Sequence, residues 1–287
     1  MERTKPIGVF DSGIGGLTVA SAIGTELPNE QILYFGDTAR CPYGDRLPEE
    51  VQSFSVQVLD FLYEQGVKML VVACNTATAV ALPMLERRYD VPVLGVVRPG
   101  ARAATSSQSH GKIGVIGTAV TISSGAYTRA VKAVDNTVEV HSLACPAFVP
   151  LVERGSWSGD EVEMVVQRTL TPLIEQSVNT LILGCTHYPL LQETIQKVMG
   201  NQVTLISSAE ETAREVKAVL TSKGQLNSLP RSESLRNRYF TSGDGTRLRA
   251  ALEDWFRIFP AEDDVVSVNL DTLTHSTDIT DFRSSLG

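Results

Sequence analysis

The sequence predicts an α/β protein of two Rossmann-like lobes with mainly parallel sheets, related by a pseudo-twofold axis, with a functional site in the cleft between the lobes. Three observations indicate this fold class. Short apolar runs alternate with amphipathic segments along most of the 287 residues. The apolar runs are hydrophobic at nearly every position, which is typical of parallel strands covered by helices on both faces. One strand-then-cysteine pattern also occurs twice, once in each half of the chain.

The individual elements follow from hydrophobic periodicity and from helix-start signals. Pro48 starts a helix, because proline fits the first helical turn and the carboxylates of Glu49 and Glu50 favour the positive end of the helix dipole. The predicted strands are Ile7–Phe10, Gln31–Phe35, Lys68–Ala73, Val93–Val97, Lys112–Ile116, Val138–Ser142, Thr180–Leu183, Val203–Ile206, Arg238–Thr241 and Val265–Leu270. The predicted helices include Pro48–Gln65, Ala77–Tyr89, Asp160–Gln176, Leu190–Met199, Ala209–Leu220 and Thr246–Phe256.

The internal repeat predicts the domain boundaries. We expect the first lobe to contain residues 1–97 and 208–270, because the segment after residue 207 packs back on the first lobe. The second lobe is expected to contain residues 98–207. Beyond Leu270 the apolar periodicity is lost, and we expect residues 271–287 to form a flexible tail.

Composition and charge exclude several classes of function. The formal net charge is -8 and no Lys/Arg run is longer than Arg87-Arg88, so we expect no nucleic-acid partner. No apolar stretch is long enough to span a membrane, and the start of the chain enters a strand without an apolar signal segment. We therefore expect a cytoplasmic protein with no membrane partner.

The four cysteines, at positions 41, 74, 145 and 185, are expected to be reduced thiols in that compartment. No C-x-x-C pair is present and the histidines are scattered without ligand spacing, so no metal site is expected.

Two of the cysteines follow strands in the same way. Leu70–Thr76 and Leu181–His187 each run from an apolar strand into a small residue, a cysteine and hydrogen-bonding residues. A buried cysteine at a strand end is usually only a small apolar residue. However, ligands bind outside the carboxyl ends of parallel strands, and a helix start after each cysteine favours the thiolate. Cys74 and Cys185 therefore resemble two acid/base groups facing one cleft, as inversion of a carbon centre requires.

The other two cysteines, Cys41 and Cys145, each precede a proline in a loop-like context. We interpret them as structural, or as merely adjacent to the cleft.

A glycine-rich turn follows the first strand. Asp11–Gly16 resembles a dinucleotide fingerprint only weakly, because Thr18 stands where the third glycine belongs. The alternative is a tight turn that brings Asp11 and Ser12 to the carboxyl end of the strand, where Asp11 can hold a ligand ammonium or assist a base. A role of Asp11 as a helix cap stays open.

His187 lies two residues after Cys185, which suits a local acid/base role. A structural histidine is the competing interpretation. The segments Pro42–Gly44 and Asn75-Thr76 offer backbone amides and hydroxyls that suit a carboxylate ligand.

Four segments together closely resemble those of bacterial glutamate racemases, within the aspartate/glutamate racemase superfamily. The resemblance extends from about Ile7 to Leu270. The segments are Phe10–Gly16 (FDSGIGG), Cys41–Gly44 (CPYG), Cys74–Thr78 (CNTAT) and Gly184–Pro189 (GCTHYP).

This resemblance implies a racemase that needs no cofactor and supplies D-glutamate for peptidoglycan, and hence for cell wall and cell shape. It implies that Cys74 and Cys185 are the two bases, that Asp11 assists Cys74, and that Glu153 and His187 act on the Cys185 side. Family members typically form homodimers. The expected substrate contacts are Asp11, Ser12, Pro42, Tyr43, Gly44, Asn75, Thr76, Thr118, Thr186 and His187.

Competing functions predict different behaviour. Aspartate racemases typically carry Glu after the second Cys-Thr, so His187 favours glutamate. A thiol hydrolase using Cys185 and His187 would leave Cys74 idle, and a non-catalytic glutamate-binding protein would exchange no protons. A pyridoxal enzyme lacks support, because Lys68 and Lys112 lie at strand starts, opposite the ligand edge.

Overall fold

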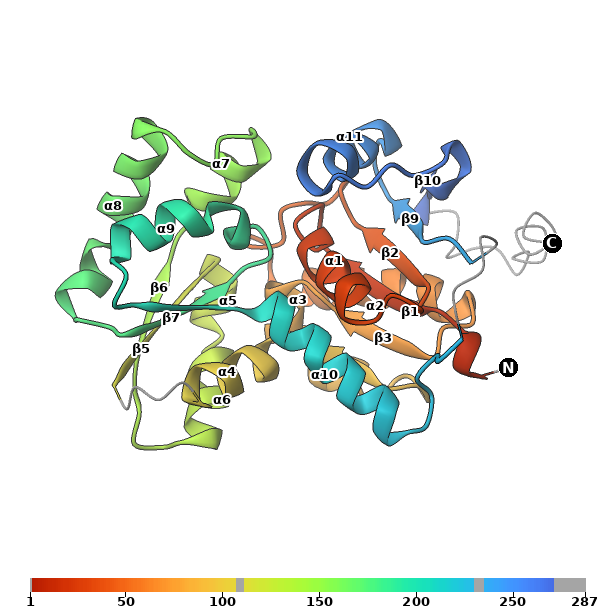
Figure 1. Ribbon diagram of the computed structural model, residues 1–287, viewed down its shortest axis with the longest axis horizontal. Coiled ribbons are helices and arrows are strands. Elements are labelled where there is room, and N and C mark those ends of the chain that lie inside the picture. Colours follow the sequence, from red (N-terminus) through yellow and green to blue (C-terminus); the bar gives the residue numbers. More distant parts are fainter. Residues whose placement is uncertain (1, 107–110, 230–234, 271–287) are drawn as a thin grey trace.

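The computed structural model describes residues 2–106, 111–229 and 235–270. Figure 1 shows two α/β bodies side by side, each built on its own sheet. We call each sheet, with the helices that cover it, a lobe. The six-stranded first sheet has the order β10 (Val265–Ser267), β9 (Arg238–Thr241), β2 (Ile32–Gly36), β1 (Ile7–Asp11), β3 (Met69–Val72) and β4 (Val93–Gly95). The four-stranded second sheet has the order β6 (Glu139–Ala144), β5 (Lys112–Gly117), β7 (Thr180–Gly184) and β8 (Thr204–Ser207).

The two sheets repeat one strand order. Every pair of neighbouring strands in the described residues is parallel. The order β2-β1-β3-β4 in the first sheet corresponds to β6-β5-β7-β8 in the second. The predicted fold class is therefore confirmed, and the strands that precede Cys74 and Cys185 occupy equivalent positions.

Each sheet is buried on both faces, as the unbroken apolar strands predict. In β3, Met69 and Val71 face one core of the first lobe, while Leu70 and Val72 face the other. Helices on both sides complete these cores. The helices are α1 (Leu17–Glu26), α2 (Pro48–Glu64), α3 (Asn75–Leu85), α4 (Val97–Ser106), α5 (Ala119–Ser123), α6 (Ala126–Val134), α7 (Phe148–Glu153), α8 (Asp160–Glu175), α9 (Gln192–Met199), α10 (Ser208–Ser222) and α11 (Gly245–Phe256), with 3-10 turns at Glu2–Thr4, Tyr188–Leu191 and Glu262–Asp264.

The predicted strands are present with small shifts at their ends. The largest shift concerns β10, which ends at Ser267 instead of Leu270. β4 ends two residues early, at Gly95, because α4 begins at Val97, and β6 ends two residues late, at Ala144. α10 packs on α1 of the first lobe and on α4 of the second. The domain boundaries at 97/98 and 207/208 stay predictions, and the predicted tail, 271–287, lies outside the described residues.

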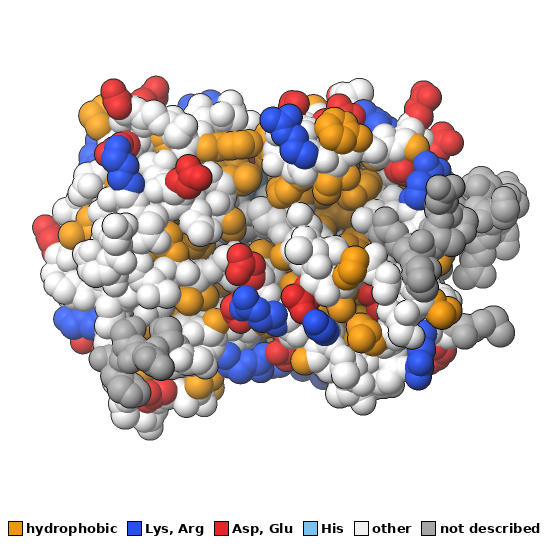
Figure 2. All heavy atoms as spheres, in the orientation of Figure 1, with side chains coloured by type: hydrophobic (Ala, Val, Ile, Leu, Met, Phe, Trp, Pro, Cys, Tyr) orange, Lys and Arg blue, Asp and Glu red, His pale blue; other side chains and the backbone are white. Residues whose placement is uncertain are grey.

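The surface agrees with the charge pattern of the sequence. Acidic and basic side chains are interspersed on the face in Figure 2 rather than gathered into one basic patch. Within the described ranges, no helix combines the length and the apolar character that crossing a membrane requires.

Candidate active site

The end of β1 presents a buried carboxylate at the seam between the lobes. The Asp11 Oδ2 atom accepts hydrogen bonds from the backbone N–H groups of Gly13 and Gly16, both at 3.0 Å. The Oδ1 atom accepts a hydrogen bond from the Thr186 hydroxyl of the second lobe at 3.3 Å. Burial raises the pKa of Asp11, while the charge of His187 and these hydrogen bonds oppose the rise. Because Gly16 lies just before α1, its hydrogen bond to Asp11 also stabilises the glycine-rich turn between β1 and α1.

Cys74 lies at the start of α3, as predicted. Its Sγ atom accepts a hydrogen bond from the Ala77 backbone N–H at 3.4 Å and lies 3.5 Å from the Ser12 hydroxyl. Burial, followed by the charge of Asp11, raises the pKa of the Cys74 thiol to about 12. The direct neighbours of Cys74 are thus Ser12 and the helix start, and Asp11 acts on it through charge.

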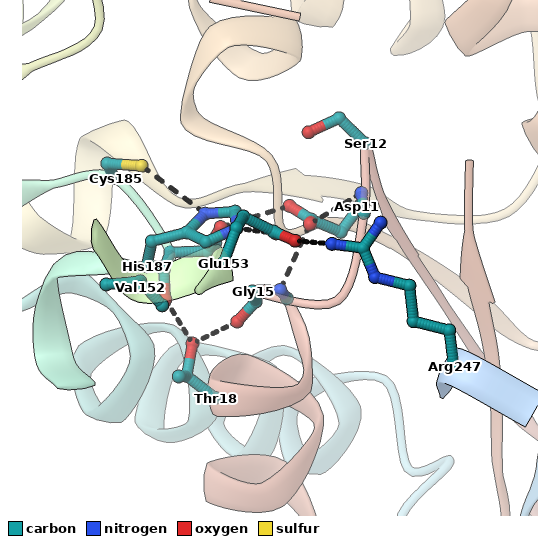
Figure 3. Close-up of polar contacts among 12 residues, drawn as sticks. Asp11, Ser12, Gly15, Thr18, Val152, Glu153, Cys185, His187 and Arg247 are labelled. Carbon is teal, nitrogen blue, oxygen red and sulfur yellow. Dashed lines mark hydrogen bonds and ion pairs between the residues drawn. The ribbon is translucent and has the colours of Figure 1, made fainter. Parts of the chain in front are cut away.

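Cys185 belongs to a polar chain in the second lobe. The Cys185 Sγ atom lies 3.8 Å from His187 Nδ1, and His187 Nε2 lies 2.7 Å from Glu153 Oε1 (Figure 3). Burial of His187 disfavours its cation, but hydrogen bonds with Cys185 and Glu153 outweigh this and raise its pKa to about 10. Burial also disfavours the Glu153 carboxylate, yet the bond with His187 holds its pKa below the usual value.

The charge of Cys185 contributes to the raised pKa of Cys74, so the two thiols lie within electrostatic reach of each other. Both are buried: Cys74 is 4% exposed and Cys185 is 6% exposed. The structure therefore brings Asp11, Ser12, Cys74, Cys185 and His187 into one buried region at the carboxyl ends of β1, β3 and β7. Such edges are where ligands bind in parallel sheets.

Hydroxyl and amide groups line the seam beside Cys74. The hydroxyls of Thr76, Thr118 and Thr121 form a triangle with oxygen–oxygen distances of 2.9, 3.2 and 3.0 Å. Asn75 Oδ1 accepts a hydrogen bond from the Tyr127 hydroxyl at 2.6 Å, while the buried Asn75 Nδ2 has no hydrogen-bond partner among the described residues. Sequence reasoning missed Thr121, whose only signal is its position three residues after Thr118 at a helix start.

The predicted contacts Pro42, Tyr43 and Gly44 belong to the loop that follows β2. Tyr43 packs in the core with its hydroxyl donating to Asp37, so only its backbone remains for a ligand. Pro42 and Gly44 line a cavity of about 290 Å³. A Cβ atom on Gly44 would lie 2.8 Å from Thr118 Cβ, so glycine permits this approach between lobes.

Cys74 and Cys185 are not among the residues that line this cavity. Both thiols nevertheless lie near its walls. Ser12, which precedes the lining residue Gly13, lies 3.5 Å from Cys74, and His187, which is bonded to the lining residue Glu153, lies 3.8 Å from Cys185. Its walls come from both lobes and include Cys41 and Cys145, which are therefore adjacent to the cleft, as one of the two interpretations expected. The lining residues are Gly13, Ile14, Thr38, Cys41, Pro42, Gly44, Asp45, Thr118, Ala119, Cys145, Pro146, Val149, Pro150, Glu153 and Arg247.

Arg247 is a second residue that sequence reasoning missed. It comes from α11 and its Nη2 atom donates a hydrogen bond to Glu153 Oε2 at 2.5 Å (Figure 3). No local pattern around Arg247 indicates this partner, which is far away in the sequence.

Comparisons with known proteins identify the family of this chain. The family model described as Asp/Glu/Hydantoin racemase matches residues 17–216. A glutamate racemase from Oceanobacillus iheyensis is 53% identical over 242 residues, which cover 84% of this chain and 87% of that protein. The chain belongs to the glutamate racemases of this family.

Solved structures of family members agree. A glutamate racemase isoform from Bacillus anthracis superposes with a TM-score of 0.87 at 46% identity, covering 93% of this chain and 98% of that one. The Francisella tularensis glutamate racemase in complex with D-glutamate gives a TM-score of 0.85 at 34% identity, covering 94% and 99%. The recognised resemblance is thus confirmed.

Proposed function

We propose that the protein interconverts L-glutamate and D-glutamate without an added cofactor, with Cys74 and Cys185 as the two bases. One observation carries the proposal. The two thiols follow β3 and β7, which hold equivalent places in the repeated strand order, and each half of the molecule thus supplies one thiol to a shared buried region. The names of relatives, such as the glutamate racemase from Oceanobacillus iheyensis, support glutamate as the substrate.

The charges around the thiols support a division of roles. The His187 cation faces Cys185 Sγ and would stabilise a thiolate there, whereas Cys74 has a raised pKa and holds its proton. In one direction the Cys185 thiolate therefore takes the Cα proton from one face of the substrate, and the Cys74 thiol delivers its own proton to the other face. The roles are exchanged in the reverse direction.

The charges of the substrate itself would also affect the two thiols. Its ammonium group, placed near Asp11, would offset the carboxylate charge that helps to raise the pKa of Cys74. Removal of the Cα proton also builds negative charge toward the α-carboxylate, and donors aimed there stabilise the transition state. Asn75 Nδ2, which no described residue engages, is such a donor, with hydroxyls from Thr76, Thr118 and Thr186 nearby in the seam.

We further propose that the protein works in the cytoplasm as a homodimer and provides D-glutamate for peptidoglycan synthesis. The resemblance to glutamate racemases supports these points. His187, at the position where aspartate racemases typically carry Glu, supports glutamate rather than aspartate as the substrate.

The test uses variants with one base removed and 3-chloroglutamate as the substrate. A remaining thiolate can take the Cα proton, so that a Cα=Cβ double bond forms as chloride leaves. The resulting enamine tautomerises to an imine, and water hydrolyses the imine to 2-oxoglutarate and ammonium. Cys74→Ser and Cys185→Ser should both lose racemisation, because a hydroxyl is a far weaker acid than a thiol. Each should still produce 2-oxoglutarate from one Cα enantiomer only, and the two variants should prefer opposite enantiomers.

Cys41→Ser and Cys145→Ser serve as matched controls, since these thiols line the outer cavity, and both should continue to racemise glutamate. Retained activity in Cys74→Ser would instead favour the thiol hydrolase. Elimination from both enantiomers by both single-thiol variants would contradict opposed faces.

A further inference from the structure

The hydrogen-bonded chain behind Cys185 continues across the seam to Arg247 of the other lobe. Arg247 and His187 each bind one oxygen of Glu153, at 2.5 and 2.7 Å respectively. We propose that Arg247 is a positioning residue for the Cys185 half of the reaction, acting through Glu153 and His187. This inference rests on the proposed function.

The chain runs from solvent into the buried site. The side chain of Arg247 is 59% exposed, that of Glu153 is 19% exposed and that of His187 is 4% exposed. With both carboxylate oxygens engaged, Glu153 has one fixed orientation. That orientation fixes the acceptor for His187 Nε2, and therefore the direction of His187 Nδ1 toward Cys185 Sγ (Figure 3).

α11 is held in place without this ion pair. The Asp244 carboxylate caps the helix by accepting a hydrogen bond from the Thr246 N–H at 2.8 Å. Arg249 donates hydrogen bonds to three backbone carbonyls of the following loop. Near the end of α11, Trp255 packs edge-on against Trp157 of the second lobe, with ring centroids 5.4 Å apart. Arg247 therefore comes from a pre-organised helix and is available to orient Glu153.

The Arg247–Glu153 ion pair also connects the two lobes. Arg247 lies on α11 of the first lobe and Glu153 ends α7 of the second; Figure 1 shows these two helices on opposite lobes. Both residues line the cavity of about 290 Å³ described above. The pair thus joins the two lobes beside His187.

The alternative is an ordinary exposed ion pair. Such pairs contribute little to stability and have no reason to affect one thiol more than the other. An effect confined to Cys185 therefore separates the two interpretations.

The experiment places Arg247→Gln in the two single-thiol backgrounds and measures kcat for elimination from 3-chloroglutamate. In Cys74→Ser, where only Cys185 works, we expect kcat to fall about 10- to 100-fold, as misplacement of a catalytic group does. In Cys185→Ser, where only Cys74 works, we expect a change within about twofold, as at a surface position. Arg247→Lys, which keeps the charge but not the planar fork, should recover part of the loss.

Arg88→Gln is the matched control, because it removes the same charge from an exposed arginine–carboxylate pair, that with Asp60, without touching Glu153. It should not discriminate between the two backgrounds. Equal losses in both backgrounds for Arg247→Gln, or no loss in either, would overturn the positioning role. If the single-thiol parents themselves show no one-sided elimination, the proposed function fails first and the role of Arg247 fails with it.

Discussion

Cys74 and Cys185 lie beside groups of different charge, so the site is electrostatically asymmetric. Cys74 is influenced by the Asp11 carboxylate, whereas Cys185 faces the imidazole of His187. The nearby carboxylate raises the pKa of Cys74, and we propose that His187, beside Cys185, directs proton removal to that side. In the proposed mechanism, a substrate ammonium beside Asp11 would reduce the difference between the two thiols, as a reaction that runs in both directions requires.

The raised pKa of His187 predicts how stability depends on pH. Its ordinary value is 6.5 and the folded value is about 10, so between these values the folded state holds a proton that the unfolded chain releases. The resulting stabilisation is complete below pH 6.5 and is lost as the pH rises through about 10. We expect the advantage of the wild type over His187→Asn in free energy of unfolding to shrink steadily from pH 6.5 toward pH 10. Urea denaturation across this range measures it, and an advantage that grows with pH would contradict the assignment.

Sequence alone could predict the site where its residues follow strands. Asp11, Cys74 and Cys185 lie at strand ends as predicted, because apolar strands and small residues mark those positions. Arg247 could not be predicted, because its partner Glu153 belongs to the other lobe and only the tertiary fold brings them together. The roles of the site residues stay predictions until the kinetics are measured.

At the scale of single elements, the β1–α1 turn determines how closely the two lobes approach. Gly15 lies directly beneath the second lobe, and a Cβ atom there would be 2.6 Å from His187 Nδ1 and 2.7 Å from Thr186 Oγ1. Thr18, near the start of α1, donates a hydrogen bond to the Thr186 carbonyl at 3.2 Å. The turn therefore needs glycine at position 15 so that His187 can remain beside Cys185.

Gly15→Ala should damage catalysis by displacing His187. We expect kcat/KM to fall about 100-fold, the order of loss that a shift of about 1 Å in a catalytic group produces. Gly24→Ala, inside α1, is the matched control, because its Cβ would meet nothing closer than Ile32 Cδ1 at 3.7 Å. That variant should keep its activity and gain about 0.5–1 kcal/mol of stability, since alanine is the better helix former. Normal kinetics in Gly15→Ala would show that His187 tolerates displacement.

Elements with clear periodicity could be predicted, and elements with mixed signals could not. Helix α2 extends from Pro48 to Glu64, within one residue of its prediction. The predicted set did not include α4, since Pro99 and Gly100 lie in its first turn and both residues disfavour helix. Val97 and Ala101 pack in the core, and this packing compensates for the low helix propensity of Pro99 and Gly100.

At the scale of the whole molecule, the repeated strand order explains why the site has two thiols. Each lobe carries the same arrangement of four strands and a cysteine after the third of them in sequence. Contacts between the lobes connect the two halves, including the Tyr127–Asn75 hydrogen bond at 2.6 Å and the Trp157–Trp255 pair. In the proposed mechanism, each lobe supplies the thiol for one face of the substrate Cα, so the reaction requires both lobes.

The most direct test of the two-thiol account is the position of deuterium after brief reaction in deuterated water. L-glutamate and D-glutamate are incubated separately with the purified protein, without added pyridoxal phosphate or metal, and the Cα deuterium of each enantiomer is measured at low conversion. The account predicts that the product enantiomer carries deuterium while the recovered substrate keeps its proton, because one thiol removes a proton and the opposite thiol delivers a solvent-derived deuteron. Equal deuterium in recovered substrate and product, from either starting enantiomer, would show that a single base serves both faces and would contradict the account.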